Sequence, residues 1–312
     1  MKTIFECLAE RFPILYVAPI DENNTDEALL SETENSVRQA LRKGQAPSGG
    51  SLSHFQGSSA DRLWTEETPA GQVTLLYLEN RADFETFLQI LSHRCRKTPI
   101  LPSVGAQTYF GLRNWEKIRA HRWSYLISGG ADWPDELKRF AADTEKSCDT
   151  LIVLSEGPYS AVSWKQTGFS SEKWNVAADF CAKQGDQIAE FDKESWNLIS
   201  LRIRTWHELA HVYCRRERPD LIRPLWDELT ADAFGLVKAI GFYDAHLAAA
   251  FLGVSAEGYS GGRLAHYLPS GTDPDDTART VWKQIQEIET ISRRFRPEQA
   301  YELLDTLLLG RF

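Results

Sequence analysis

The stretch Trp206-His207-Glu208-Leu209-Ala210-His211 decides how this chain is organised. It lies near the end of a segment, about residues 192–216, whose apolar residues recur at helical spacing, so we expect a long amphipathic helix. Residues four apart lie on the same face of a helix, and His207 and His211 can therefore direct imidazole nitrogens at one ion. Glu208 lies one position further round, beside that ion. The spacing predicts a metal site on this helix.

A second helical run follows a break at Pro219 and Pro224. It extends from about residue 225 to residue 240, and within it Glu228 and Asp232 are again four apart and share a face. Catalytic zinc usually takes three protein ligands and keeps a fourth position for water. We therefore expect Glu228 to be the third ligand. Asp232 is expected to fix one imidazole by accepting its distal N–H.

A solvated helix face that carries two histidines by chance is the alternative interpretation of this motif. The chain has only 7 histidines in 312 residues, so the spacing has roughly a one per cent probability of arising at random. The residues around the two histidines are apolar, as a partly buried site requires. They are Trp206, Leu209, Ala210 and Val212.

The pattern His207-Glu208-x-x-His211 followed by Glu228-x-x-x-Asp232 resembles the gluzincin group of zinc metallopeptidases. In that group two helices present His, His and Glu to the metal. The run from Glu228 to Phe234 is also similar to the second ligand helix of the small peptidases that cleave bacterial repressors. The resemblance covers residues 207–232 and implies a zinc-dependent hydrolase, in the first place a peptidase acting on a peptide or protein. The resemblance carries no information about which peptide or protein is the substrate.

The motif also implies a division of roles among the residues of the site. Zinc held by His207, His211 and Glu228 would lower the pKa of a bound water to about 7. Glu208 would take the proton of that water and deliver it to the leaving amine, as general base and then acid. A further donor is needed for the oxyanion that forms. The candidates for that donor are Tyr267, His266, Arg263 and Tyr243.

Two other functions remain open on the sequence alone. The same zinc site could act on a non-peptide amide, or modify a peptide without cutting it. Alternatively, zinc could be structural in a non-catalytic regulatory module. Structural zinc is usually closed by four ligands, so a fourth ligand such as Cys214 or Asp232 would favour the module. Glu208 argues against it, because a structural site has no use for a general base.

Composition predicts a cytoplasmic protein. The net charge of −9, from 44 acidic and 35 basic residues, excludes a general affinity for nucleic acid or an anionic membrane. Five cysteines without paired spacing fit reduced thiols. An acid at Glu6 comes too early for a secretory signal, and the longest apolar run, residues 12–20, is about half of a membrane span. No feature of the sequence predicts an oligomeric state.

The order of the predicted elements indicates an α+β fold. We expect one domain over residues 1–312, with an α+β part at 1–190 and a helical metal-binding part at 191–312. The small N-terminal sheet, with its helices, would pack on the mainly helical C-terminal half. Strands are predicted at 14–18, 73–78 and 149–154. Helices are predicted at 25–43, 81–93, 134–146, 171–184, 192–216, 225–240, 277–295 and 297–309.

The remaining long segments lack a regular pattern. Residues 44–59 are rich in Gly, Ser and Pro and are predicted to form a mobile loop, and residues 98–113 are predicted to be irregular. In the peptidases that the motif resembles, an edge strand beside the metal helix aligns the substrate backbone. By this analogy, residues 73–78 or 149–154 would be that edge strand.

Overall fold

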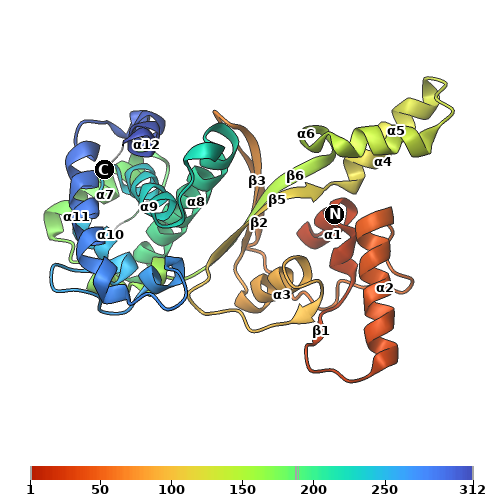
Figure 1. Ribbon diagram of the computed structural model, residues 1–312, viewed down its shortest axis with the longest axis horizontal. Helices are drawn as coiled ribbons and strands as arrows, with labels where there is room; N and C mark the ends of the chain where they lie inside the picture. Colours follow the sequence, from red (N-terminus) through yellow and green to blue (C-terminus); the bar gives the residue numbers. More distant parts are fainter. Residues whose placement is uncertain (1, 187, 189, 311–312) are drawn as a thin grey trace. The chain divides into compact units, whose positions relative to one another are not determined.

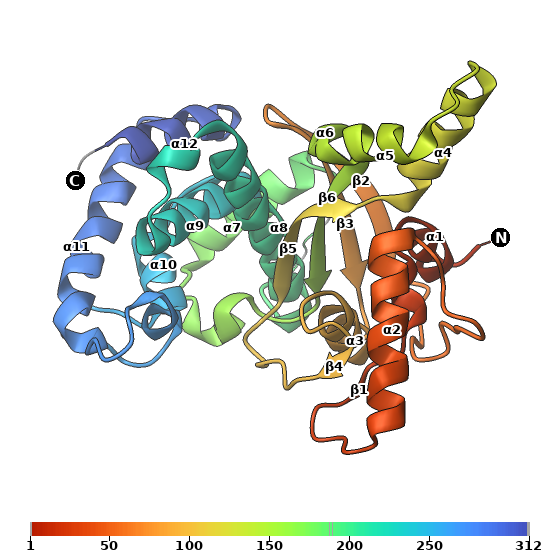
Figure 2. The same ribbon diagram turned by 45° about the vertical axis from the view of Figure 1, so that its right-hand side comes forward.

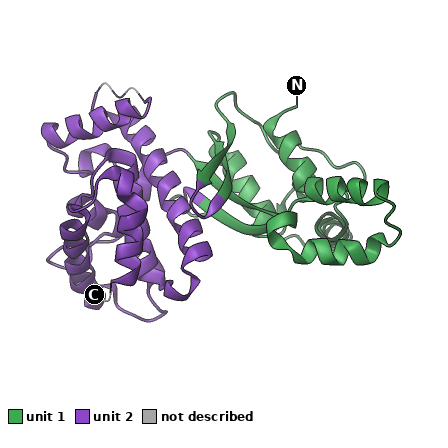
Figure 3. Ribbon diagram, turned by 90° about the horizontal axis from the view of Figure 1, so that it is seen from above, with its two compact units in different colours: residues 1–67, 72–102, 107–155 green, residues 68–71, 103–106, 156–312 purple. Residues whose placement is uncertain are grey.

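The structure is a computed structural model and describes residues 2–186, 188 and 190–310. The chain forms two compact units (Figure 3). Unit 1 comprises residues 1–67, 72–102 and 107–155, and unit 2 comprises residues 68–71, 103–106 and 156–312. Unit 1 contains the named strands and unit 2 is mainly helical. The predicted α+β class is therefore confirmed.

A four-stranded sheet forms the centre of unit 1, in the order β2-β3-β6-β5 (Figure 1). The two inner strands run parallel, in register from Thr74 opposite Leu151 to Leu78 opposite Ser155. In β6 residues 151–155 are all buried, and in β3 four of residues 73–78 are buried, on both faces of the strand, as expected for parallel strands covered on both faces. The strand bounds are β2 Arg62–Thr68, β3 Gly71–Leu78, β5 Ala106–Arg113 and β6 Cys148–Ser155.

Helices make up most of the rest of unit 1 (Figure 2). The longest is α2, which starts where the Asp26 carboxylate accepts the N–H groups of Ala28 and Leu29. It ends at Gly44, whose φ of 64° is the left-handed conformation typical of a helix C-terminus. The other elements are α1 Ile4–Arg11, η1 Pro13–Tyr16, β1 Ile20–Asp21, α2 Glu27–Lys43, α3 Arg81–Leu91, β4 Arg96–Lys97, α4 Trp115–Ile127, α5 Trp133–Ala142 and α6 Thr144–Ser147.

Two predictions for unit 1 are wrong. The strand predicted at residues 14–18 is largely the 3-10 turn η1, because Pro13 has a fixed φ that suits a first helical position, and a short buried apolar run does not distinguish strand from helix. Residues 98–113, predicted to be irregular, contain β5. None of its residues is fully buried, and it includes Gly111 at φ 65°, so it lacks an apolar alternation.

The prediction that residues 73–78 or 149–154 form an edge strand is also wrong. These residues lie in β3 and β6, which are the inner strands and have a hydrogen-bonded neighbour on each side. A strand whose backbone groups are already paired on both sides cannot add an extended peptide. The edges of this sheet are β2 and β5.

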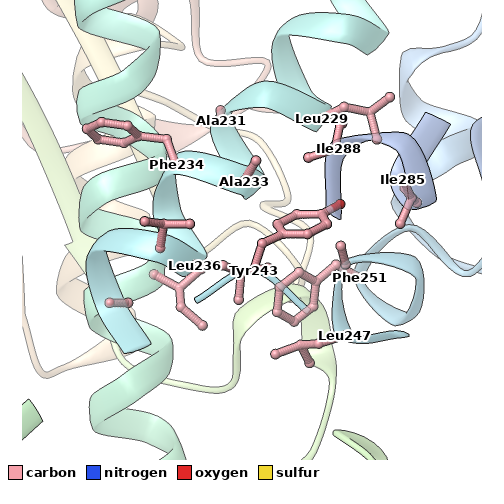
Figure 4. Close-up of a cluster of buried hydrophobic side chains, with 14 of the residues drawn as sticks. Leu229, Ala231, Ala233, Phe234, Leu236, Tyr243, Leu247, Phe251, Ile285 and Ile288 are labelled. Carbon is pink, nitrogen blue, oxygen red and sulfur yellow. The ribbon is translucent and has the colours of Figure 1, made fainter. Parts of the chain in front are cut away.

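Unit 2 is built around one apolar core that its helices share (Figure 4). α7 buries Trp174, Ala177 and Cys181 in this core, and it belongs to unit 2 together with the later helices. α10 was not predicted because it is apolar on nearly every face and lacks helical periodicity. The helices are α7 Ser171–Lys183, α8 Lys193–Glu217, α9 Pro224–Ile240, α10 Ala245–Leu252, α11 Pro274–Ser292 and α12 Ala300–Leu309.

Shorter 3-10 turns connect these helices. They are η2 Tyr159–Ala161, η3 Trp164–Gln166, η4 Pro219–Leu221, η5 Arg263–Tyr267 and η6 Pro297–Gln299. Across the part of the chain that the structure describes, no helix combines the length and the apolar character needed to cross a bilayer.

Helices α8 and α9 lie side by side and antiparallel (Figures 1 and 2). His211 contacts Asp227, and four residues earlier His207 contacts Asp232, so residue numbers rise along one helix as they fall along the other. The backbones approach closely at Gly235. A Cβ atom built there would lie 2.9 Å from the carbonyl oxygen of Ile203 and 3.4 Å from the Cβ of His207. The missing side chain allows this approach.

Replacing Gly235 with Ala should therefore destabilise the protein. Alanine gains about 1 kcal/mol of helix propensity over glycine, but overpacking against a backbone atom costs about 1–3 kcal/mol. We expect the free energy of unfolding, measured in urea, to fall by about 1 kcal/mol. The control is Asn35→Ala on an exposed position of α2. Only helix propensity changes there, and the free energy of unfolding should rise. A Gly235→Ala protein that gains stability would contradict the close approach.

Candidate metal site

Three side chains from α8 and α9 converge on one point. Each of His207, His211 and Glu228 offers one ligand atom, and these atoms lie within 4.8 Å of one another. The two Nε2 atoms are 3.0 Å apart. In the Glu228 carboxylate, Oε2 lies 3.5 Å from Nε2 of His207 and Oε1 lies 3.5 Å from Nε2 of His211. The side chain of His207 is only 5% exposed. The group has the donors and the spacing to hold a metal ion.

Carboxylates fix the orientation of both imidazoles. The Nδ1 atom of His207 lies 2.9 Å from Asp232 Oδ1, and that of His211 lies 2.8 Å from Asp227 Oδ2. In a neutral imidazole whose one N–H is at Nδ1, that N–H donates to the carboxylate and Nε2 carries a lone pair. With both histidines in this form, the two lone pairs would face each other 3.0 Å apart, and a cation between them would relieve the repulsion.

The carboxylate of the third candidate ligand is only partly satisfied. Oε2 of Glu228 is buried and makes no hydrogen bond, which is costly for a carboxylate in the protein interior. A cation between this oxygen and the two Nε2 atoms would satisfy all three groups. Two imidazoles and one carboxylate are a donor set that suits zinc, although other first-row metals accept the same ligands. The residues therefore fit a bound metal.

The acidic side chains around the imidazoles favour their protonated forms. Burial lowers the pKa of His207, but the carboxylates of Asp232 and Glu228 outweigh that effect, and the pKa rises to about 10. The pKa of His211 is also raised, because its bond to Asp227 outweighs burial. Burial opposes ionisation of Glu228, yet the two histidines hold its pKa well below the usual range. The site thus strongly favours positive charge at its centre.

Asp232 connects the ligands to two further groups. Its Oδ1 accepts a hydrogen bond from Tyr159 Oη at 2.6 Å, and its Oδ2 accepts one from Arg263 Nη2 at 2.6 Å. Nη1 of Arg263 lies 3.1 Å from Tyr159 Oη and 3.8 Å from Glu228 Oε2. Asp232 is 1% exposed, and its pKa stays low because Arg263 and His207 outweigh the effect of burial.

The candidate donors for an oxyanion separate into two pairs. Arg263 and Tyr267 lie at the site, and both interact with the Glu228 carboxylate. His266 is exposed. Tyr243 is buried in the core of unit 2, among Leu247, Phe251 and Ile288 (Figure 4), and its hydroxyl makes no hydrogen bond. Arg263 and Tyr267 are therefore the two candidates whose positions suit an oxyanion donor. Their role as donors stays a prediction.

Glu208 follows His207 on α8 and is half-buried, which leaves its carboxylate partly accessible to solvent. Its predicted role as a general base stays a prediction. Cys214 is fully buried, and burial raises the pKa of its thiol, with Asp227 adding to the effect. Among the described residues, the ligand group includes neither Cys214 nor Asp232. A site with three protein ligands is typical of catalytic zinc.

Two residues of the site were not predicted from the sequence. Asp227 precedes Glu228, and its position one step round α9 places it opposite His211 once the helices pack antiparallel. A helical projection of both helices could have found it. Tyr159 lies 48 positions before His207, in a turn after β6. No spacing rule connects it to the histidines, because only the tertiary fold brings it there.

Comparison with known proteins gives a family and no function. No curated protein and no solved structure matches the chain. The model of a family of unknown function, DUF7005, matches residues 4–184 and 179–303. Since these two segments together span most of the sequence, the chain belongs to the DUF7005 family of unknown function.

Proposed function

We propose that this protein is a zinc-dependent hydrolase, and specifically a metallopeptidase that acts on a peptide or protein. The observation that carries the proposal is the convergence of three donor atoms from His207, His211 and Glu228. Both imidazoles are oriented through Nδ1 by carboxylates, as in zinc sites generally. Within the described residues the group contains three ligands, which favours a catalytic site over a structural one.

The residues around the ligands supply the remaining parts of a hydrolytic site. A zinc ion bound there would act as a Lewis acid and lower the pKa of water toward neutrality. Glu208, adjacent to His207 on α8, would accept a proton from the attacking water and pass it to the leaving group. Arg263 and Tyr267 lie beside Glu228 and would donate hydrogen bonds to the carbonyl oxygen as it gains negative charge.

Metal analysis tests the ligand assignment. Protein purified without chelator should contain about one zinc per chain, and His211→Ala should lose it, because two ligands rarely suffice for a stable zinc site. Asp232→Asn should keep zinc but bind it about 10- to 100-fold more weakly, since the imidazole loses its carboxylate partner. Elemental analysis and chelator competition measure both effects.

The matched control is His246→Ala, which removes an exposed histidine on α10 and should leave zinc content unchanged. Absence of zinc from the wild-type protein, even after zinc is supplied, would reject the hydrolase proposal. It would leave a helical binding protein as the better description.

Substitution of Glu208 by Gln tests the chemistry. Zinc content should be unchanged, and turnover of a mixed peptide library should fall by about 10²- to 10⁴-fold, the usual contribution of a general base. Mass spectrometry of the products measures this, because peptide cleavage adds one water and breaks the chain. The control is Glu217→Gln at the exposed end of the same helix, which should keep full activity.

The products also separate the competing functions. Peptides that change mass without being cut would indicate modification rather than proteolysis. An inert library combined with hydrolysis of small amides would indicate a non-peptide substrate. A zinc-loaded protein that hydrolyses neither would support the regulatory module. Undiminished hydrolysis by the Glu208→Gln protein would remove Glu208 from the mechanism.

A further inference from the structure

The hydroxyl of Tyr159 lies at the centre of the hydrogen-bond network behind the ligands. It lies 2.8 Å from His207 Nδ1, 2.6 Å from Asp232 Oδ1 and 3.1 Å from Arg263 Nη1. Tyr159 is 4% exposed, so water does not substitute readily for these partners. The network therefore involves a third segment of chain in addition to α8 and α9.

The hydrogen bonds around the Tyr159 hydroxyl indicate which group donates each proton. Tyr159 donates its only proton to Asp232 and accepts one from Arg263. The Nδ1–H of His207 then faces two acceptors, the carboxylate of Asp232 and the phenol oxygen of Tyr159. Both contacts favour the tautomer with hydrogen on Nδ1, which leaves Nε2 free to bind metal.

The ring of Tyr159 is held as firmly as its hydroxyl. Phe251 packs edge-on against it, with ring centroids 4.7 Å apart and planes at 80°. The guanidinium of Arg263 lies over its face, 4.9 Å from the centroid. The ring therefore has little freedom to rotate away from His207.

The metal helix itself also holds the turn that carries Tyr159. Arg204, three positions before His207 and on the same face of α8, donates from Nη2 to the carbonyl oxygen of Gly157 at 3.2 Å and lies 3.5 Å from that of Pro158. Beyond Tyr159, two consecutive non-glycine residues adopt left-handed conformations, Ser160 at φ 53° and Ala161 at φ 60°. Such conformations are uncommon and persist where the surrounding contacts determine them.

We propose that Tyr159 is a positioning residue of the metal site: together with Asp232 it holds the Nδ1–H of His207 and directs Nε2 toward the metal, while Arg204 acts through it by holding the turn. This inference rests on the proposed metal site. It adds a requirement that the two-helix motif does not contain, because the ligand helices alone lack the turn at residues 157–161.

The first test is Tyr159→Phe, which removes the hydroxyl and keeps the ring. We expect zinc to bind about 10- to 100-fold more weakly in competition with a chromophoric chelator. The matched control is Tyr213→Phe, which removes another phenol-to-carboxylate hydrogen bond on α8, to Asp305 at 3.0 Å. That bond does not involve a ligand, and zinc affinity should be unchanged.

A spectroscopic measurement separates positioning from general stability. In the zinc-loaded protein, the Nδ1 proton of His207 should give a protected signal in ¹⁵N-detected imidazole spectra. In Tyr159→Phe this proton should exchange faster with solvent, whereas the corresponding proton of His211, which is held by Asp227, should not. Equal changes at both histidines would indicate a general loosening and overturn the proposal.

A double-mutant cycle tests the part played by Arg204. Arg204→Lys should weaken zinc binding in the wild-type background but have little further effect in Tyr159→Phe, since residues that act through one another are not additive. Additive losses would show that Arg204 does not act through Tyr159.

The outcomes distinguish this inference from the proposed function. A wild-type protein that binds no zinc rejects the metal site itself. A wild-type protein that binds zinc, with Tyr159→Phe binding it equally well, keeps the metal site and overturns the role of Tyr159.

Discussion

The close antiparallel approach of α8 and α9 is the constraint on which the site depends. At Gly235 the second helix comes so near the first that a methyl group would lie 2.9 Å from the carbonyl oxygen of Ile203. Within about two turns of Gly235, the same approach places acidic side chains of α9 opposite the imidazoles of α8. A wider separation would leave Glu228 too far from His207 and His211 to share an ion. The close packing at Gly235 thus helps to bring the three candidate ligands together.

The charges that this packing buries favour a cation at the candidate site. Asp227, Glu228 and Asp232 bring three negative charges into a largely buried region, and Arg263 supplies one positive charge. Two negative charges are left. Buried charges are costly unless they are compensated, and two compensations are available: one divalent metal ion, or one proton on each imidazole. The raised pKa values of His207 and His211 favour the second compensation, a proton on each imidazole. Either compensation would balance the buried charge.

How much of this the sequence could predict depends on how local each contact is. The histidine pair and the pairing of Glu228 with Asp232 follow from helical periodicity, which needs only the spacing along each helix. The helices α7, α8, α9 and α11 are strongly patterned and were predicted within a few residues. By contrast, β5 has no buried face to give it an alternation. Tyr159 lies in a turn that accepts a hydrogen bond from Arg204, a residue far along the chain, so no local pattern indicates it.

The sequence separation between these residues also indicates the order in which the site can assemble. The three ligands come from one helical hairpin and need only its short loop to close. Tyr159 and Arg263 must come from 48 positions before His207 and 31 positions after Asp232. Closing a longer loop costs more entropy, though the cost grows slowly with length. Packing in the core of unit 2, rather than contacts among the ligands, must offset this entropy. A partly folded helix hairpin can therefore bring together the three donors and Asp232, but Tyr159, the second partner of His207 Nδ1, is in place only when the whole unit has formed. The affinity of the proposed site for a metal would for that reason depend on the complete fold, whereas the motif by itself sets the identity of the candidate ligands.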